Sequence, residues 1–391
     1  MGKCIIWGAG YFGEYIQDAV LEYGYEIIAY CDSSKTGTIG KYEIITIENA
    51  VDICKNEDVS IVIGVKEEKY IKEIEIAIRE MFSDSVKYEY GMDLYSCIQE
   101  KELERFYLNM QYCWDIDLKA EFLRWVKNIY SEVEYWVTDV ADRRGISNKY
   151  NLKCRNNDKF SHRILVNKVS EGSIVLDIGC GLVSPYGDVL PDGKKIQFVP
   201  VDALAHYYNR INAQIKDGKR KDYKCNFGMF EFLGNCFGQN YADAIIINNA
   251  LDHCIDPYRS IVECLYVLKV DGVLHMVHRR AEAVYEKWTG LHRWNVDCID
   301  ENLVLWNKEY AINVNEAISK YADVEVEYDN VSNREKQSVS VSITKKKEFE
   351  LNQLLNVEKD TDILVSCIEI LMEQQSRYNF QFEELLHMAQ F

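Results

Sequence analysis

Short apolar runs alternate with amphipathic stretches over residues 1–97 of the chain. Runs of strand length occupy 4–7, 27–30 and 60–65, and helical spacing occupies 13–22 and 69–81. Strands that alternate with helices are typical of a parallel sheet covered by helices. We therefore predict that residues 1–97 form a small α/β domain.

The pattern changes to purely helical spacing over residues 98–151. Apolar side chains recur about every 3.6 residues there, and the segment has no strong strand signal. The apolar stripe consists of Phe106, Met110, Trp114, Leu118, Phe122, Trp125 and Ile129. This spacing predicts a helical bridge between two domains.

A second alternation of strands and helices fills residues 152–347. Strand-like runs lie at 174–178, 196–201, 244–248, 273–277, 324–328 and 338–343. The first four runs are separated by stretches long enough for helices, which predicts a second parallel sheet. The last two runs lie close together, which predicts an antiparallel hairpin at the edge of that sheet.

The tail, residues 348–391, is acidic and has helical spacing. Apolar side chains at heptad-like steps are Leu364, Cys367, Leu371 and Tyr378. They span about one and a half heptads, whereas a coiled coil is expected to show roughly three to four. Two interpretations therefore stay open, namely a homodimer formed through this C-terminal helix and docking of the helix onto its own domain.

Composition and charge narrow the class of partner. Apolar residues make up 48% of the 391 residues and charged residues 28%, which are ordinary proportions for a globular protein. The chain has 63 acidic and 45 basic residues, a formal net charge of −18. A surface of that sign repels phosphate backbones and anionic lipid headgroups. We therefore expect neither nucleic acid nor a membrane surface as a partner.

The 13 cysteines are scattered and include no CxxC pair and no His/Cys cluster at metal-ligand spacing. Free thiols without a disulfide framework indicate a reducing compartment. The chain also shows no secretory leader and no run of about 18 apolar residues. These features predict a cytoplasmic protein and no metal site.

A glycine-rich turn lies between the first strand and the first helix. Gly8, Gly10 and Gly13 form a GxGxxG pattern, and Asp32 ends the next strand 19 residues after Gly13. Such glycines let the backbone approach a pyrophosphate at a helix start, and the acid can bind a ribose diol. The alternative is that the turn serves the packing of strand and helix and the domain binds nothing, or that it binds a sugar nucleotide or a partner chain.

The segment WGAGYFG, with the later YCD and the loop 36–40, resembles the short Rossmann-like domain appended to enzymes of sugar and surface-glycan metabolism. The resemblance implies a nucleotide-binding fold, and we expect NAD or another nucleotide as the ligand. No YxxxK pair occurs in residues 1–97, so the Tyr and Lys proton relay of short-chain dehydrogenases and epimerases is missing. This argues against redox chemistry by the domain alone.

A second glycine-rich turn gives a sharper signal. Residues 174–181 read IVLDIGCG, an apolar strand that ends in Asp177 and turns through Gly179 and Gly181. Glycine lets the backbone approach a ligand without a clash at Cβ. The segment resembles the first motif of class I S-adenosylmethionine (SAM) methyltransferases, in which the strand-end acid and the turn hold the amino-acid part of SAM. Val183 stands where that family often has a third glycine.

The elements that follow match the same family in order and spacing. Asp202 ends the next strand 21 residues beyond Gly181, where the resemblance implies a carboxylate that binds the ribose. Phe230 and Glu231 lie in the loop where it implies contacts with adenine. The alternative for Asp202 is a solvent-exposed residue that ends the strand.

Residues 242–272 resemble the family's fourth-strand block, a strand followed by a polar turn and a helix that ends in Val-Leu-Lys. In that family the turn faces the methyl donor and the substrate mouth, which implies a cofactor contact for Asn249. The turn contains Asn248, Asn249, Asp252 and His253.

The next strand ends at His278 and leads into HRRAEA and GLHRWN. These segments resemble a subset of the methyltransferases with an HxxNEAE and a GLHxWN signature, and they contain Glu282 and His292. Ala281 departs from the signature, which has Asn at that position.

Methyl transfer to a hydroxyl group requires alignment of donor and acceptor and removal of a proton. Histidine, with an ordinary pKa of about 6.5, suits the role of general base. His253, His278 and His292 are the candidates, and Glu282 either acts as the base or orients a histidine. The alternative for the histidines is a role in capping or core packing, and the alternative for Glu282 is a solvated position on a helix. Trp294 is a candidate wall for the acceptor.

Together these features predict an α/β chain with two doubly wound Rossmann-like domains, a helical bridge and a C-terminal helix. The second domain is predicted to be a SAM-dependent methyltransferase that acts at an oxygen of a small-molecule or carbohydrate-like acceptor. Two other hypotheses stay open. One is an NAD-dependent oxidoreductase or epimerase that uses the first domain, and the other is a non-enzymatic nucleotide-binding scaffold.

Overall fold

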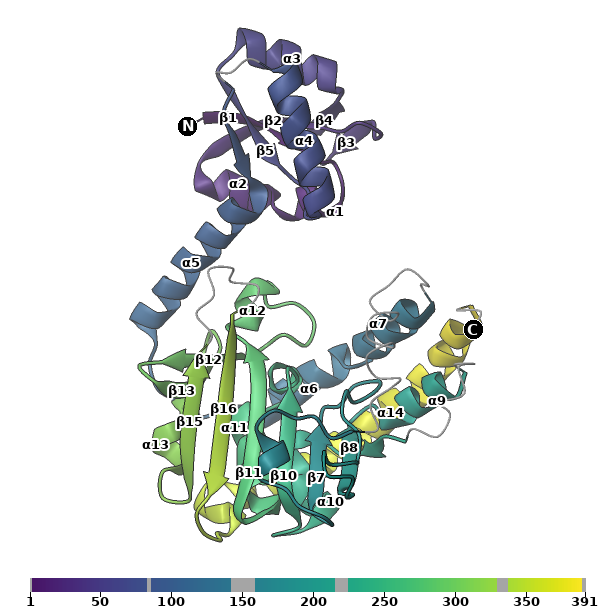
Figure 1. Ribbon diagram of the computed structural model, residues 1–391, viewed down its shortest axis with the longest axis vertical. Helices are drawn as coiled ribbons and strands as arrows, with labels where there is room; N and C mark the ends of the chain where they lie inside the picture. The colour runs from purple at the N-terminus through teal and green to yellow at the C-terminus, as the bar shows by residue number, and fades with distance from the viewer. Residues whose placement is uncertain (1, 83–85, 142–158, 215–223, 329–336, 389–391) are drawn as a thin grey trace. The chain divides into compact units, whose positions relative to one another are not determined.

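The computed structural model describes residues 2–82, 86–141, 159–214, 224–328 and 337–388 (Figure 1). The chain divides into two compact units, Met1–Met110 and Gln111–Phe391. This division lies inside the predicted bridge 98–151. The bridge region contributes the end of one helix to unit 1 and two helices to unit 2, and 142–151 lie outside the described residues.

A six-stranded sheet forms the centre of unit 1, in the order β3-β4-β2-β1-β5-β6. The strands are β1 (Gly2–Trp7), β2 (Tyr25–Cys31), β3 (Gly37–Ile39), β4 (Tyr42–Ile45), β5 (Val59–Ile63) and β6 (Tyr88–Tyr90). Neighbouring strands are parallel except for β3, which is antiparallel to β4. The predicted α/β class of this region is confirmed.

Helices cover both faces of that sheet. They are α1 (Tyr11–Tyr15), α2 (Gln17–Tyr23), α3 (Ile47–Asn56), α4 (Glu68–Met81) and α5 (Gly91–Asn109). Successive side chains of a strand point to opposite faces. Accordingly, Ile5 and Trp7 of β1 join a buried cluster with α3 and α4, whereas Cys4 and Ile6 join a cluster with α2 and α5. The helix predicted over 13–22 is divided at Ile16 into α1 and α2.

A seven-stranded sheet forms the centre of unit 2, in the order β15-β16-β11-β10-β7-β8-β9 (Figure 1). The strands are β7 (Ile174–Ile178), β8 (Gln197–Asp202), β9 (Asn226–Phe227), β10 (Ala242–Asn248), β11 (Leu268–Arg279), β15 (Ala322–Tyr328) and β16 (Ser338–Lys345). The neighbouring strands β11, β10, β7, β8 and β9 are parallel to one another. Strand β16 is antiparallel to both β11 and β15. The predicted edge hairpin is confirmed.

A separate three-stranded antiparallel sheet, β12-β13-β14, was not expected from the sequence. Its strands are β12 (Asn295–Ile299), β13 (Asn302–Trp306) and β14 (Ala311–Asn313). The strands are short, and the buried polar side chains of Asn295 and Asp297 interrupt the apolar pattern of β12. Asp297 of β12 is fully buried because its carboxylate pairs with the Arg280 guanidinium at 2.5 Å. Because a polar residue occupies a core position, the hydrophobic pattern of the sequence does not indicate this strand.

The α-helices of unit 2 are α6 (Leu118–Asn128), α7 (Tyr130–Ala141), α9 (Ala205–Gln214), α10 (Leu233–Phe237), α11 (Pro257–Val267), α12 (Glu282–Tyr285), α13 (Val314–Ile318) and α14 (Val357–Met388). Short 3₁₀ turns are η1 (Leu165–Asn167), η2 (Phe230–Phe232), η3 (Leu251–His253) and η5 (Leu351–Gln353). The start of α11 is capped by the Asp256 carboxylate, which accepts a hydrogen bond from the Arg259 backbone N–H. Among the described residues, no helix is long and apolar enough to cross a membrane.

The tail helix α14 packs against α6 and α7 of its own unit. Its side chains Cys367, Tyr378 and Phe382 belong to a buried cluster with residues of α6, α7 and α9. The ring of Tyr378 stacks on that of Tyr130 with centroids 4.0 Å apart. The tail therefore docks onto its own unit, and the homodimer stays a prediction. The side chain of Leu364 lies outside the described part of the helix.

Candidate active site

The carboxyl ends of the parallel strands β7, β8, β10 and β11 meet at one edge of the large sheet, which is where open α/β sheets bind ligands. A cavity of about 570 Å³ lies at this edge. Nine residues selected from the sequence line it, namely Asp177, Gly179, Gly181, Asp202, Phe230, Glu231, Asn249, His253 and His278. The fold therefore brings these distant positions together.

The turn after β7 is tied to the end of β8. The backbone N–H groups of Gly179 and Cys180 donate to the Val201 carbonyl at 2.8 and 3.2 Å. Gly179 has φ +69°, and a Cβ there would lie 2.5 Å from Ala250 Cβ. Gly181 has φ +63°, and among the described residues a Cβ there would meet only Trp136 within 4 Å, at 3.5 Å. Gly179 is thus required for packing as well as for the backbone conformation.

Asp177 is a buried carboxylate at the wall of the cavity. It is 1% exposed, and its Oδ2 atom has no hydrogen-bond partner among the described residues. Burial raises the pKa of this carboxyl to about 7, and the negative charge of Asp202 raises it further. A hydrogen bond from Ser184 lowers the pKa but does not outweigh burial. A buried anion with a free oxygen suits a cationic ligand group.

Asp202 closes the same turn from β8. Its Oδ2 accepts a hydrogen bond from the Gly181 N–H at 3.1 Å, and its Oδ1 accepts one from the Leu204 N–H at 2.8 Å. Burial raises the pKa of the Asp202 carboxyl to about 6, although both hydrogen bonds oppose that shift. Asp202 is therefore more than an exposed residue that ends a strand.

Glu231 and Phe230 lie in η2, on another wall of the cavity. The Glu231 carboxylate accepts hydrogen bonds from the backbone of Ile255 and Asp256 at 2.6 and 3.2 Å. It is 2% exposed, and burial raises its pKa to about 7. Glu231 thus holds the loop before α11. A Cβ on Gly179 would approach the Phe230 ring to 2.9 Å, so this ring packs on the glycine turn.

Asn249 joins the ends of β10 and β11. Its backbone N–H donates to the Val277 carbonyl at 2.8 Å, and its side-chain oxygen accepts from the Arg279 N–H at 2.9 Å. The residue adopts φ +49°, which asparagine tolerates better than most residues. These bonds fix the turn that carries η3 and His253.

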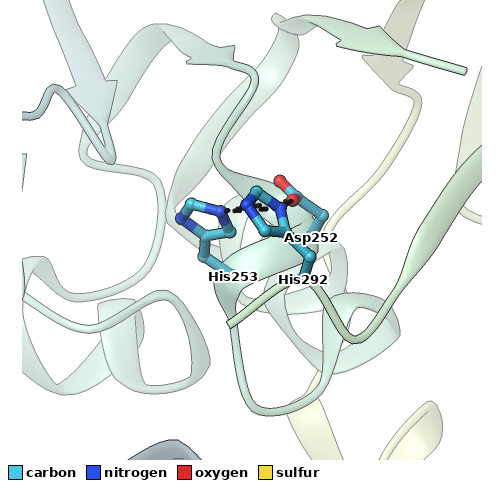
Figure 2. A group of neighbouring side chains, drawn as sticks. All are labelled: Asp252, His253 and His292. Atoms are coloured by element: carbon cyan, nitrogen blue, oxygen red, sulfur yellow. Dashed lines mark hydrogen bonds and ion pairs between the residues drawn. The ribbon is translucent and has the colours of Figure 1, made fainter. Parts of the chain in front are cut away.

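Two histidines and an aspartate lie side by side (Figure 2), and His253 of this group lines the cavity. The Asp252 Oδ2 atom lies 2.9 Å from His292 Nδ1 and 3.3 Å from His253 Nε2, and the two ring nitrogens are 3.2 Å apart. Asp252 is almost fully buried, whereas both histidine side chains are 24% exposed. The sequence has no metal-ligand spacing, yet the fold gathers three potential ligand atoms within 4.8 Å of one another.

The electrostatics of this group follow from the shared carboxylate. Burial alone lowers the pKa of His292, but the hydrogen bond and charge of Asp252 outweigh it and raise the pKa to about 8. Burial opposes ionisation of Asp252, but the charge of His253 and the hydrogen bond from His292 hold its pKa below the ordinary value. Asp252 is therefore an anion that orients both rings.

His278 and Glu282 take different positions. His278 lines the cavity, is 1% exposed, and has its pKa lowered to about 4 by burial, so its ring is neutral near pH 7. Glu282 is buried and does not line the cavity. Its Oε1 lies 3.4 Å from Arg279 Nη1, and burial raises its pKa. Glu282 thus lies behind the cavity wall.

The expectation that Trp294 walls the acceptor is wrong. Trp294 is fully buried, its ring packs 5.2 Å from that of Trp114, and it does not line the cavity. Glu132 and Trp136 of α7 also line the cavity, which the sequence did not predict. Both belong to the predicted bridge, where the apolar spacing indicated a helix but nothing in the pattern linked it to the cavity.

In unit 1 the Asp32 carboxylate, which was predicted to bind a ribose, accepts hydrogen bonds from its own loop and from the glycine turn. Asp32 Oδ2 accepts from the Ala9 N–H at 2.8 Å, and Oδ1 accepts from the N–H groups of Ser34 and Lys35 at 2.9 and 3.0 Å. Burial opposes these bonds, but together they lower the pKa of Asp32. The acid therefore has a structural role in its loop.

The glycines of that turn differ in what they contact. A Cβ on Gly13 would lie 1.8 Å from the Gly8 carbonyl oxygen, and one on Gly8 would lie 2.6 Å from the Gly64 oxygen. Gly10 has only Lys35 Nζ nearby, at 3.9 Å. Gly8 and Gly13 are thus required for strand and helix packing, and Gly10 faces open space beside a cation.

Two regions of the chain match protein families. Residues 176–276 match the family model described as a methyltransferase domain, and residues 3–72 match the model described as the PglD N-terminal domain. The first match includes Asp177 through His253 and ends before His278. No curated protein sequence matches the chain.

Several solved methyltransferases have similar folds. A SAM-dependent methyltransferase from Methanosarcina mazei is 16% identical over 49% of this chain and 100% of its own, with a TM-score of 0.30. The N-methyltransferase NodS from Bradyrhizobium japonicum, bound to S-adenosyl-L-homocysteine, is 12% identical over 56% and 100%, with a TM-score of 0.35. The 1,6-didemethyltoxoflavin-N1-methyltransferase from Burkholderia thailandensis is 14% identical over 61% and 94%, also at 0.35.

Proposed function

We propose that the cavity of unit 2 binds SAM and that a hydroxyl oxygen of a small-molecule or carbohydrate-like acceptor receives the methyl group, because residues 176–276 match the methyltransferase domain model. One observation carries this proposal. The buried Asp177 carboxylate presents an unpartnered oxygen at the cavity wall, and the same cavity is lined by His253. A cation-binding group and a proton acceptor thus share one space.

The residues of unit 2 fit the cofactor. Asp177 Oδ2 would accept from the ammonium group of SAM, and the turn at Gly181 lets the backbone approach its carboxylate. The Asp202 oxygens each accept one backbone hydrogen bond and keep a lone pair for a ribose hydroxyl. When bound, SAM supplies a methyl group on a positively charged sulfur, which makes that carbon electrophilic.

We assign the role of general base to His253, the histidine of the cluster that lines the cavity. Its Nε2 lies 3.3 Å from the Asp252 carboxylate, which favours the tautomer with hydrogen on Nε2. Nδ1 is then the proton acceptor. The hydroxyl proton moves to His253 Nδ1 as the oxygen gains the methyl group.

Other groups would support this proton transfer. Glu132 Oε1 lies 3.8 Å from His253 Nδ1, so its negative charge stabilises the imidazolium that forms. His292 shares the Asp252 carboxylate and orients it. His292 and Glu282 are therefore assigned positioning roles, and His278 is a neutral group at the cavity wall.

For unit 1 we propose that it binds a nucleotide-bearing molecule or positions the acceptor. Its match to the PglD N-terminal domain and its resemblance to domains of glycan enzymes support a carbohydrate-like acceptor. NAD remains one hypothesis for the ligand. The bonds that Asp32 makes within its own loop leave it less available for a ribose than the sequence indicated.

Calorimetric titration of the full chain tests the cofactor. We expect wild type to bind SAM or its demethylated product with micromolar or tighter affinity, Asp177→Ala to lose binding, and the exposed Asp192→Ala to retain it. Binding of NAD without any binding of SAM would support the oxidoreductase hypothesis instead. Mass spectrometry of cell extract incubated with labelled SAM identifies the acceptor by the gain of one methyl group.

A further inference from the structure

The group formed by Asp252, His253 and His292 has a geometry that hydrogen bonding does not explain. Its three facing atoms, one oxygen and two ring nitrogens, form a triangle with sides of 2.9, 3.2 and 3.3 Å (Figure 2). Each ring nitrogen carries either one hydrogen or one lone pair in the ring plane. Two N–H groups can both point at the Asp252 oxygen, but the short contact between the nitrogens then has no attractive partner.

A metal ion accounts for all three sides at once. Zinc lies about 2.0–2.2 Å from histidine nitrogens and carboxylate oxygens. Two atoms at about 2.1 Å from one ion, at angles between those of an octahedron and a tetrahedron, are about 3.0–3.4 Å apart. The observed sides lie in or next to that range. The three ligand atoms therefore already have the separations that an ion requires.

The surroundings also suit a cation. The Asp252 Oδ1 atom is buried and has no partner among the residues that the structure describes. Glu132 Oε1 lies 3.8 Å from the far nitrogen of His253. Because His253 lines the cavity and both rings are partly exposed, an ion could be reached from the cavity and keep one side for a further ligand.

We propose that Asp252 Oδ2, His253 Nε2 and His292 Nδ1 bind one divalent zinc ion, with the fourth position open to water or to an oxygen of a molecule in the cavity. Both imidazoles bind as neutral rings and Asp252 binds as the anion, so any proton held by the triangle is released to solvent when the ion enters. The ion and one carboxylate leave a net charge of +1 at this site.

Zinc binding would also affect methyl transfer, and this expected effect rests on the proposed function. A neutral ring that coordinates zinc through Nε2 carries its hydrogen on Nδ1. The same ring then cannot accept a proton from the acceptor at Nδ1. Zinc occupancy and the general-base role of His253 therefore exclude each other, and added zinc is expected to inhibit methyl transfer.

Zinc binding is tested with the purified full chain after removal of metals by a chelator. Titration with zinc chloride is expected to show one site, and titration with cobalt chloride is expected to give visible bands of nitrogen and oxygen ligation. The variant His292→Gln keeps a side chain that can donate a hydrogen bond to Asp252. It should weaken zinc binding by at least about tenfold. Asp252→Asn and His253→Ala should do the same.

His206→Ala is the matched control, because this histidine is exposed on α9 and is not one of the three proposed ligands. It should bind zinc as wild type does. Equal affinity in wild type and in His292→Gln would overturn the metal site, and so would a cobalt spectrum of thiolate ligands, because the chain has free cysteines. Circular dichroism checks that each variant is folded.

Activity separates failure of the metal site from failure of the proposed function. Absence of SAM binding by the wild-type protein would contradict the methyltransferase assignment, whether or not the protein binds zinc. Zinc that binds at the triangle and stimulates turnover would support the site but contradict the role of His253 as a free base. Absence of any zinc site with normal SAM turnover would overturn only the metal proposal.

Discussion

The Asp202 carboxylate accepts a hydrogen bond from the Gly181 backbone N–H at 3.1 Å, which ties the end of β8 to the glycine turn after β7. Its second oxygen holds the Leu204 N–H at 2.8 Å. One side chain thus shapes two loops of the cavity. Asp202 therefore has a structural role that does not depend on a bound ligand.

Replacement of this acid should cost stability as well as binding. Asp202→Ala leaves two backbone N–H groups without their partner, which is expected to lower the free energy of unfolding by about 1–3 kcal/mol. The matched control is Asp192→Ala, because the Asp192 carboxylate accepts from the Lys194 N–H on an exposed turn. Urea unfolding should show a change within about 0.5 kcal/mol for the control. Similar losses in both variants would contradict the structural role of Asp202.

Asp177 should make SAM binding depend on pH. Burial raises the pKa of its carboxyl to about 7, so the group is largely protonated in acid and becomes an anion as the pH rises through 7. Affinity for the SAM ammonium is therefore expected to increase between pH 6 and 8. Calorimetry over this range should show the rise in wild type. Asp177→Asn should bind weakly at every pH and show no such rise.

The same group should act on stability with the opposite sign. A carboxyl whose pKa is raised on folding contributes stability that is full below its unfolded pKa of about 3.8 and is lost as the pH rises through about 7. Asp177→Asn should remove this loss and be more stable than wild type near pH 8. Because Glu231 and Glu263 have pKa values raised in the same direction, the measurement is the difference between the two proteins in urea unfolding. A difference that does not change with pH would contradict the assignment.

Gly179 should tolerate alanine less well than an unpacked glycine of similar conformation. At Gly179 the alanine Cβ would lie 2.5 Å from Ala250 Cβ, whereas at Gly193, with φ +86°, no atom of the part of the chain that the structure describes lies within 4 Å. Gly193→Ala measures backbone strain alone, about 1 kcal/mol or somewhat more. Gly179→Ala adds the clash and should be destabilised further and lose SAM binding. Equal effects would show that the turn yields without cost.

His253→Ala and His292→Ala are expected to keep SAM binding and to slow turnover. Loss of a general base typically costs about 10²–10⁴ in rate, which is our expectation for His253→Ala. His292→Ala should have a smaller effect, because His292 acts through Asp252. The measurement pairs calorimetry with single-turnover rates on the identified acceptor. Normal turnover in both variants would show that the base has been assigned wrongly.

The sequence predicted most of the sheet and much of the cavity because both are encoded locally. Apolar runs indicated β7 and β10, and glycines with a strand-end acid indicated the turn at residues 177–181. Local patterns did not reveal β12, in which buried Asp297 pairs with Arg280 across the fold. They also suggested that Trp294 was available to an acceptor, whereas packing on Trp114 buries it.

By itself, the sequence determined two glycine-rich turns, the strands that precede them and the class of the second domain, because backbone conformation depends on neighbouring residues. Only the tertiary structure decided that His292 meets Asp252 from 40 positions away and that Glu132 of α7 approaches His253. Such contacts depend on how whole elements pack against one another. No spacing along the chain encodes the position of a side chain that arrives from a distant loop.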